Sequence, residues 1–176
     1  MDQIGLQKLI HTDGKAMNKS LMVKSIGTGL LAGGFERKGA SSWYLHGSEA
    51  IAVVNLQKYR FSDIWFINIG IWIKALGDKR YPRFNECHLN IRAPSLWPDQ
   101  RSEFEELFDL NEKRFTDDEW SEKQEIFAEE YLVPMCQELM NMSKLRERIE
   151  SLSKTGLLMR VAVDWLRDSS RLEIRN

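Results

Sequence analysis

The chain has 176 residues, 43% of them hydrophobic and 29% charged, with a formal net charge of −1. This balance is typical of a folded globular chain and excludes a disordered one, while only two cysteines exclude a disulfide framework. The longest apolar run, 64–73, is about half as long as a membrane-spanning helix. We therefore expect one cytoplasmic domain over 1–176, with a helix-and-sheet part at 1–98 and a helical part at 99–176.

The first predicted element is a helix from about residue 13 to residue 32. Met22, Ile26 and Leu30 recur on one helical face, and the glycines at 33–34 can supply the positive φ that ends a helix. Gly27 and Gly29 argue against a continuous helix, because each costs about 1 kcal/mol in a helix interior. A break at these glycines therefore stays open.

Four strand-like segments follow, each rich in aromatic and β-branched residues and bounded by turn-forming or polar residues. They span 36–46, 49–58, 62–74 and 86–92. Gly47 and Ser48 form a hairpin-like connection between the first two. The pattern predicts a four-stranded, mostly antiparallel sheet.

Alternation along these strands predicts two different sheet faces. On the third strand Trp65, Ile67, Ile69, Ile71 and Ile73 form an apolar face that should meet the helices, and on the fourth Cys87 should share that face. The opposite face would gather these side chains around Trp72: Asn55, Gln57, Asn68, His88, Asn90 and Arg92. They either satisfy backbone groups beneath a covering loop or form a ligand or partner site.

The chain after Pro98 is predicted to be helical. Thr116 and Glu119 form a capping box, and Phe115 and Trp120 occupy the positions of a hydrophobic staple. Pro134 should kink or restart this helix. A short helix capped by Ser143 should reach about residue 152, and a last helix should span 157–167. The expected fold is α+β: an N-terminal helix, the sheet, and C-terminal helices packed on one sheet face.

Four short segments occur in an order that resembles the bacterial family of domains of unknown function DUF4304. They are Gly-Phe-Glu-Arg-Lys-Gly at 34–39, Asn-Leu-Gln-Lys at 55–58, Phe-Ile-Asn-Ile-Gly at 66–70 and Cys-His-Leu-Asn-Ile-Arg at 87–92. The resemblance covers about residues 15–168. It implies an α+β fold without a known activity, and it associates the chain with immunity proteins of bacterial toxin systems.

No catalytic, metal or cofactor signature is strong enough to assign. Cys87 and His88 are adjacent, so on a strand they should point to opposite faces and not chelate one ion. Acid–base chemistry stays open, because His46 and His88 could share a sheet face and Glu86 could orient one of them. We expect no metal site, no cofactor and no assigned catalytic residue.

Charge is distributed unevenly along the chain. Residues 1–98 carry 13 Lys/Arg and 7 Asp/Glu, whereas residues 99–130 carry 4 and 13. Within the acidic block one helical face should hold Asp118, Glu122, Glu125 and Glu129, at spacings i, i+4, i+7 and i+11. This face is either simply solvated or attracts a basic protein partner.

Nucleic-acid binding has less support than protein binding. Basic residues such as Lys19, Lys24 and Arg37 lie near Trp43 in the sequence, but the pI of about 6.3 argues against a nucleic-acid partner. The leading hypothesis is a protein-binding role, in its most concrete form an immunity-type protein that occludes a basic bacterial toxin domain. The alternative is a small-molecule-binding or enzymatic domain that uses the polar sheet face.

Overall fold

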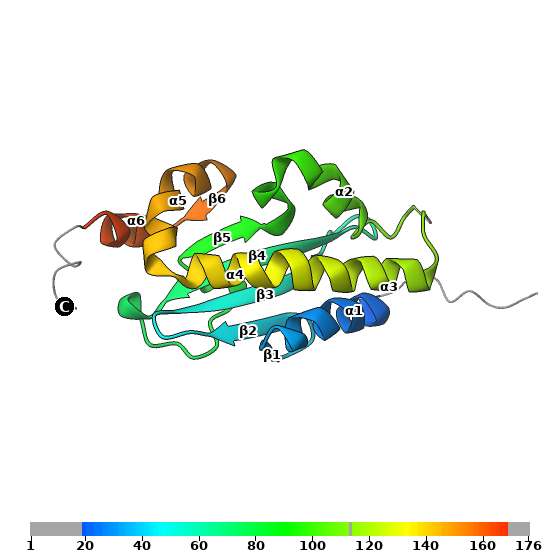
Figure 1. Ribbon diagram of the computed structural model, residues 1–176, viewed down its shortest axis with the longest axis horizontal. Helices are drawn as coiled ribbons and strands as arrows, with labels where there is room; N and C mark the ends of the chain where they lie inside the picture. The colour runs from blue at the N-terminus through cyan, green and yellow to red at the C-terminus, as the bar shows by residue number, and fades with distance from the viewer. Residues whose placement is uncertain (1–18, 113, 169–176) are drawn as a thin grey trace, which may run out of the picture.

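The computed structural model describes residues 19–112 and 114–168. They form an antiparallel sheet whose six strands lie side by side in chain order, with helices packed on one face (Figure 1). The strands are β1 Glu36–Arg37, β2 Ser42–His46, β3 Ala50–Lys58, β4 Trp65–Ile73, β5 Leu89–Arg92 and β6 Gly156–Leu158. This α and β architecture with an antiparallel sheet was predicted, but the predicted number of four strands is wrong.

Two differences produce the higher strand count. The segment predicted as one strand, 36–46, turns at 38–41, where Gly39 has φ +78°, so β1 folds back on β2 with Arg37 opposite Trp43. The second difference is β6, which pairs with β5 through Leu89 and Leu158, although Leu157 was predicted to begin a helix. Both elements are two or three residues long, so tertiary pairing rather than local pattern defines them.

The helical elements divide into helices and short 3-10 turns. The helices are α1 Lys19–Ala32, α2 Arg101–Glu106, α3 Asp117–Ile126, the π-helical segment η5 Phe127–Leu132, α4 Val133–Met140, α5 Met142–Thr155 and α6 Arg160–Arg167. The 3-10 turns are η1 Lys74–Leu76, η2 Phe84–Glu86, η3 Ala93–Leu96 and η4 Pro98–Gln100. No helix within 19–112 and 114–168 has the length and apolarity needed to cross a membrane.

The helix α1 is continuous through its glycines and ends at the predicted place. Gly34 adopts φ +87° directly after it. A β-carbon on Gly29 would lie 2.8 Å from Cβ of Ala128, and one on Gly33 would lie 2.4 Å from Cγ2 of Val133. Gly29 therefore permits close helix packing instead of breaking α1, and that packing offsets its low helix propensity.

The start of α3 is the predicted capping box. The amide of Glu119 donates to Oγ1 of Thr116 at 3.3 Å, and the amide of Thr116 donates to Oε2 of Glu119 at 2.8 Å. The rings of Phe115 and Trp120 meet edge to face with centroids 5.8 Å apart, as the staple predicts. Local sequence thus determines where this helix begins.

Pro134 does not break the rod that α3, η5 and α4 form (Figure 1). The wide π-helical turn lies directly before it. A proline cannot donate to the carbonyl four residues earlier, and its ring crowds that carbonyl, so a widened turn accommodates it. The predicted cap at Ser143 is wrong: Oδ1 of Asn141 accepts from the amide of Lys144 at 3.1 Å, and α5 begins at Met142.

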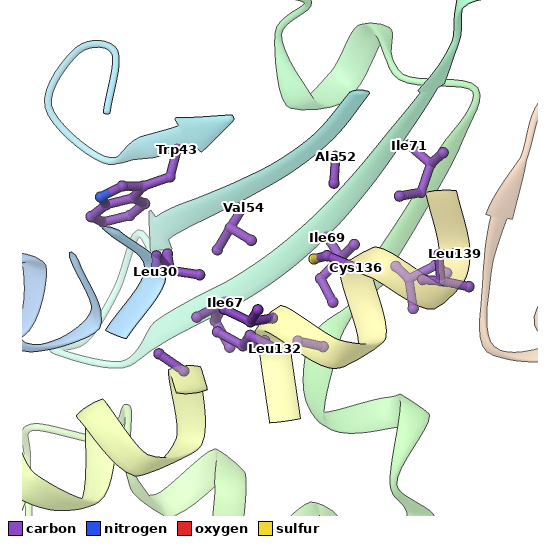
Figure 2. Packing of buried hydrophobic residues seen from close by; sticks show 14 of the residues in the cluster. Leu30, Trp43, Ala52, Val54, Ile67, Ile69, Ile71, Leu132, Cys136 and Leu139 are labelled. Carbon is purple, nitrogen blue, oxygen red and sulfur yellow. The ribbon is translucent and has the colours of Figure 1, made fainter. Parts of the chain in front are cut away.

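The main core lies between the sheet and these helices. Ile67, Ile69 and Ile71 of β4 face the helices and are at most 1% exposed, as the alternation predicted. Figure 2 shows Ile67 beside Leu132 of η5 and Ile69 beside Cys136 of α4. The opposite face of the sheet, which we call the second face, is where the sequence placed a polar group of residues.

Candidate functional site

Strand register arranges the second face in rows across the sheet. Asn55 of β3 pairs with Asn68 of β4, which pairs with Arg92 of β5, and these three form an amide–arginine row. Two residues along β4, Gly70 pairs with Asn90. Gln57 and His88 belong to the same face, so the register places the six predicted polar residues on it; their role in binding stays a prediction.

The amides on this face bond mainly to neighbouring parts of the fold. Nδ2 of Asn55 donates to Oγ of Ser42 at 2.9 Å, and Nδ2 of Asn90 donates to the carbonyl of Cys87 at 3.1 Å. Nδ2 of Asn68 donates to Oε1 of Gln57 at 3.4 Å. These bonds fit the interpretation that buried amides satisfy nearby polar groups.

Trp72 is not the centre of the amides, because it lies four residues from Asn68 along β4. Its indole nitrogen donates to the carbonyl of Gly77 at 3.4 Å, and its ring is 4.4 Å from that of His88. Nδ1 of His88 accepts from the amide of Ile73 at 2.9 Å, and burial lowers the pKa of His88. The His88 imidazole is therefore held neutral in a structural role.

Cys87 lies on the second face, contrary to the prediction. It follows the turn η2 rather than belonging to β5, and its Sγ would be 2.8 Å from a β-carbon on Gly70. It packs with Trp72 in a small second cluster. Burial raises the pKa of the Cys87 thiol to about 12, which makes it a poor nucleophile at neutral pH. Cys87 and His88 share a face, yet residues 19–112 and 114–168 hold no cluster of three metal-binding side chains.

The partner of His46 is Glu36, which sequence reasoning missed. Oε1 of Glu36 lies 3.1 Å from Nε2 of His46 and accepts from the hydroxyl of Tyr81 at 2.7 Å. The Tyr81 bond is the main reason that the pKa of Glu36 is lowered. Glu86 instead accepts from the amide of Arg83 at 2.8 Å and pairs with Lys79. Only the pairing of β1 with β2 brings Glu36 near His46.

A cavity of about 360 Å³ opens beside Arg92, where β5 ends and α2 approaches β4. The Arg92 guanidinium carbon lies 3.3 Å from the centroid of the Phe66 ring, and burial lowers the pKa of Arg92. Arg92 makes no ion pair within the part of the chain that the structure describes. Sequence reasoning placed Arg92 on the correct face but missed the aromatic wall that Tyr59 and Trp65 contribute to this cavity.

The predicted acidic row lies along α3 and enters η5. Asp118, Glu122 and Glu129 are exposed and Glu125 is half-buried. The Glu125 carbonyl and Cγ of Glu129 lie 2.9 and 3.0 Å from the β-carbon position of Gly29, so the end of the row borders α1. Among the residues described, none of the four carboxylates has an ion-pair partner.

Acidic residues earlier in the block behave differently. Glu105 pairs with Arg101 at 2.8 Å, and Arg114 pairs with both Glu106 and Glu112 at 2.7 and 2.6 Å. The acidic row therefore contributes four carboxylates to the part of the block's charge that has no ion pair among the described residues. Its exposure is consistent with either a solvated helix face or a partner surface.

The family model described as Domain of unknown function (DUF4304) matches residues 26–167. The chain belongs to this family. The match runs from within α1 to the end of α6, close to the span that the four short segments suggested. No curated protein and no solved structure matches the chain.

The groups of this DUF4304 domain that could act as acid, base or nucleophile mostly have partners within the fold. Of the groups that could act as acid, base or nucleophile, His88 is bonded to backbone and the Cys87 thiol is protonated. The His46–Glu36 pair has the contact that an acid–base dyad needs, but Tyr81 shares the same carboxylate oxygen. Among the described residues, charged groups without an ion pair include the acidic row, Arg92, and cations in a groove beside α1.

Proposed function

We propose that the DUF4304 domain binds a basic protein through the acidic row of α3. One observation carries the proposal: four neighbouring carboxylates lack ion-pair partners in the described structure and lie beside an exposed apolar side chain. That side chain is Ile126, 42% of which is exposed. It stands four residues after Glu122 and three before Glu129, so it lies at the edge of the row next to these two carboxylates.

The carboxylates of the row and the apolar side chain of Ile126 have complementary roles in protein recognition. Like charges at i, i+4 destabilise a helix by a few tenths of a kcal/mol per pair, and a basic partner would relieve this repulsion. Long-range attraction between opposite charges chiefly speeds association. An apolar side chain that becomes buried at the centre slows dissociation, because its contact surface leaves water.

In its most concrete form, this function is that of an immunity-type protein that occludes a basic toxin domain. Occlusion requires a complementary surface and no catalytic residue of its own. Both the unpaired charge of the acidic row and the structural use of His88 and Cys87 support such a role. The association of DUF4304-like sequences with toxin systems is an analogy, and the surface is the physical argument.

Charge reversal in the middle of the row tests the proposal. A partner would be isolated by pull-down from the source organism, and its association rate measured at low and high salt. Glu122→Lys/Glu125→Lys should slow association strongly at low salt and weakly at high salt, and Ile126→Asp should speed dissociation.

A matched control separates the effect of the acidic row on association from the effect of the net charge. Asp78→Lys/Glu147→Lys makes the same change in net charge at exposed acids outside the row. The control should keep most of the wild-type association rate. If the partner associates equally fast after reversal of Glu122 and Glu125, or if the control slows it as much, the row is merely a solvated face and the proposal is wrong.

The cavity beside Arg92 supports a second candidate function, the binding of a small molecule. Its aromatic wall could hold a planar apolar body, while the guanidinium could receive a carboxylate. Titration with benzoate, followed by NMR, should shift signals from Phe66 and Tyr59 in the wild type but not in Arg92→Leu. Equal shifts in both proteins would show that Arg92 does not take part in binding the carboxylate.

A further inference from the structure

A groove separates α1 from the β1–β2 hairpin on the helix-covered side of the sheet. Its volume is about 600 Å³. Lys19 and Lys24 of α1 line one wall and Arg37 of β1 lines the other, and none of the described residues in the lining is acidic. None of these three cations makes an ion pair with any residue in 19–112 or 114–168. The groove is therefore a concave surface with uncompensated positive charge.

The positions of the cations are only partly fixed by the fold. Nη2 of Arg37 donates to the carbonyl of Ala40 at 2.9 Å, and its guanidinium carbon lies 5.8 Å from the Trp43 ring centroid. This leaves other guanidinium donors of Arg37 available. Lys24 is exposed, and its ammonium group has no ion pair or aromatic contact within 19–112 and 114–168 that would hold it away from the groove. Arg37 thus offers an ordered donor, and Lys24 an exposed one that can adapt.

Trp43 adds an independent sign of a missing partner. Its side chain is completely buried, yet its Nε1 atom has no hydrogen-bond acceptor among the residues that the structure describes. This nitrogen lies only 3.3 Å from the position that a β-carbon would occupy on Gly27, and both residues line the groove. Buried indole N–H groups usually find an acceptor. A ligand acceptor atom that lies beside Gly27 would give the Trp43 N–H its hydrogen-bond partner.

We propose that this groove binds a small molecule that carries an oxyanion group, either phosphate or carboxylate, with at least two negative charges. Lys19, Lys24 and Arg37 supply the charge, Trp43 supplies a buried donor, and Val23 and Leu31 supply apolar contact for the rest of the ligand. The site is separate from the acidic row, so it does not depend on the protein-binding function.

The same geometry disfavours a nucleic acid as the occupant. Single-stranded nucleic acids are held by stacking of bases on accessible aromatic rings. Among the described residues that line the groove, Trp43 alone is aromatic, and it is 0% exposed, so none of them offers a ring for stacking. The acidic row would also repel a long polyanion.

Isothermal titration at low ionic strength tests the site, with pyrophosphate and citrate as probes for phosphate and carboxylate ligands. We expect Lys24→Ala to weaken binding of the preferred probe about tenfold, because a charge-assisted contact is lost. Trp43→Phe keeps an aromatic ring without the donor and should also weaken binding. Gly27→Ala keeps the indole but places a methyl group beside Nε1, and should have the same effect.

Lys144→Ala on α5 is the matched control, because it removes an exposed lysine that does not line the groove. Urea unfolding of each variant shows that it is folded before titration. The proposal is overturned if neither probe binds, if Lys144→Ala weakens binding as much as Lys24→Ala, or if Trp43→Phe and Gly27→Ala both bind as the wild type does. Tighter binding of a single-stranded oligonucleotide than of either probe would also overturn it.

Discussion

On the helix-covered face of β4, Ile67, Ile69 and Ile71 are buried beneath α1, η5 and α4, whereas on the second face Asn68 stands between Asn55 and Arg92. The first face is held by non-directional apolar contacts. The second combines a small apolar cluster around Trp72 with directional hydrogen bonds to nearby loops and strands. The two faces of β4 are thus stabilised by different kinds of interaction.

The comparison shows where uncompensated groups remain. Polar side chains of the second face mostly bond within the fold, so their presence alone does not indicate a ligand. The helical layer has an apolar inner surface but carries charges without partners on its outer surface, at the acidic row and at Lys24. In this molecule the candidates for recognition therefore lie largely on the layer that also builds the core.

The largest expected effect is that of a polar side chain on the helix-covered face. Ile69 is fully buried, so Ile69→Asn removes apolar burial and leaves an amide without partners. These two costs together should reduce the free energy of unfolding by about 4 kcal/mol, measured by urea unfolding. A loss no greater than that caused by Asn68→Leu, on the neighbouring residue, would contradict the distinction between the faces.

The next largest effect tests how closely the helices approach each other above that face. Gly29→Ala would place a β-carbon 2.8 Å from Cβ of Ala128 and 2.9 Å from the Glu125 carbonyl, so α1 must move away from α3. We expect the free energy of unfolding to fall by about 2 kcal/mol.

Gly27→Ala is the matched control for this helix, because it gives the same gain in helix propensity. Its β-carbon would meet only the Trp43 ring, at 3.3 Å or more. Thermal unfolding of both variants separates helix propensity from packing. If Gly29→Ala is as stable as Gly27→Ala, the close approach of α1 and α3 is not what Gly29 provides.

Much of this architecture could be predicted where the signal is local. The Thr116 box fixes the start of α3 because its bonds join residues three apart, and alternation along β4 separates Ile69 from Asn68. The spacing of the acidic row likewise followed from helical periodicity. By contrast, β6 is only Gly156–Leu158, and it is a strand because β5 offers it a partner. No local pattern contains that information.

The candidate sites show the same limit. Lys24, Arg37 and Trp43 could be selected from composition, but only the packing of α1 against the hairpin places them around one groove. The contact between Glu36 and His46 likewise depends on the turn at Gly39, which reverses the chain between them. Single-residue alternation also misplaced Cys87, because the strand begins at Leu89, three residues later than predicted.

A smaller effect is expected at the start of α3, in the helical layer. Thr116→Ala removes an acceptor for the Glu119 amide and should cost about 1 kcal/mol in urea unfolding. Thr116→Ser keeps the hydroxyl and should restore most of this loss. Equal stability of the alanine variant and the wild type would mean that water satisfies this amide equally well.

A still smaller loss should follow replacement of the central amide of the second face. Asn68→Leu removes a long hydrogen bond, 3.4 Å, to the exposed Gln57, whose oxygen can return to water. We expect the free energy of unfolding to fall by about 0.5 kcal/mol, which is at the low end for a lost hydrogen bond. The circular dichroism spectrum should not change. A loss near that of Ile69→Asn would show that the second face depends on its amides as strictly as the first depends on its isoleucines.

The smallest expected effect is a pH dependence of stability that His88 introduces on the second face. Burial lowers the His88 pKa in the folded state below its ordinary value of 6.5, so between the two pKa values the unfolded chain binds more protons. His88 therefore contributes stability above pH 6.5 that is lost as the pH falls toward the folded-state pKa. Glu36, Glu86 and Glu119 have lowered pKa values and stay ionised over this window.

The variant His88→Asn isolates this contribution. Its side-chain oxygen can accept from the Ile73 amide in place of Nδ1, but it does not titrate. Urea unfolding at pH 7.5 and pH 5.5 should show a larger loss of stability in the wild type than in His88→Asn. Equal losses in both proteins would mean that His88 takes up its proton as easily in the folded chain as in the unfolded one. The second face would then be open to water at Trp72, unlike the dry face beneath the helices.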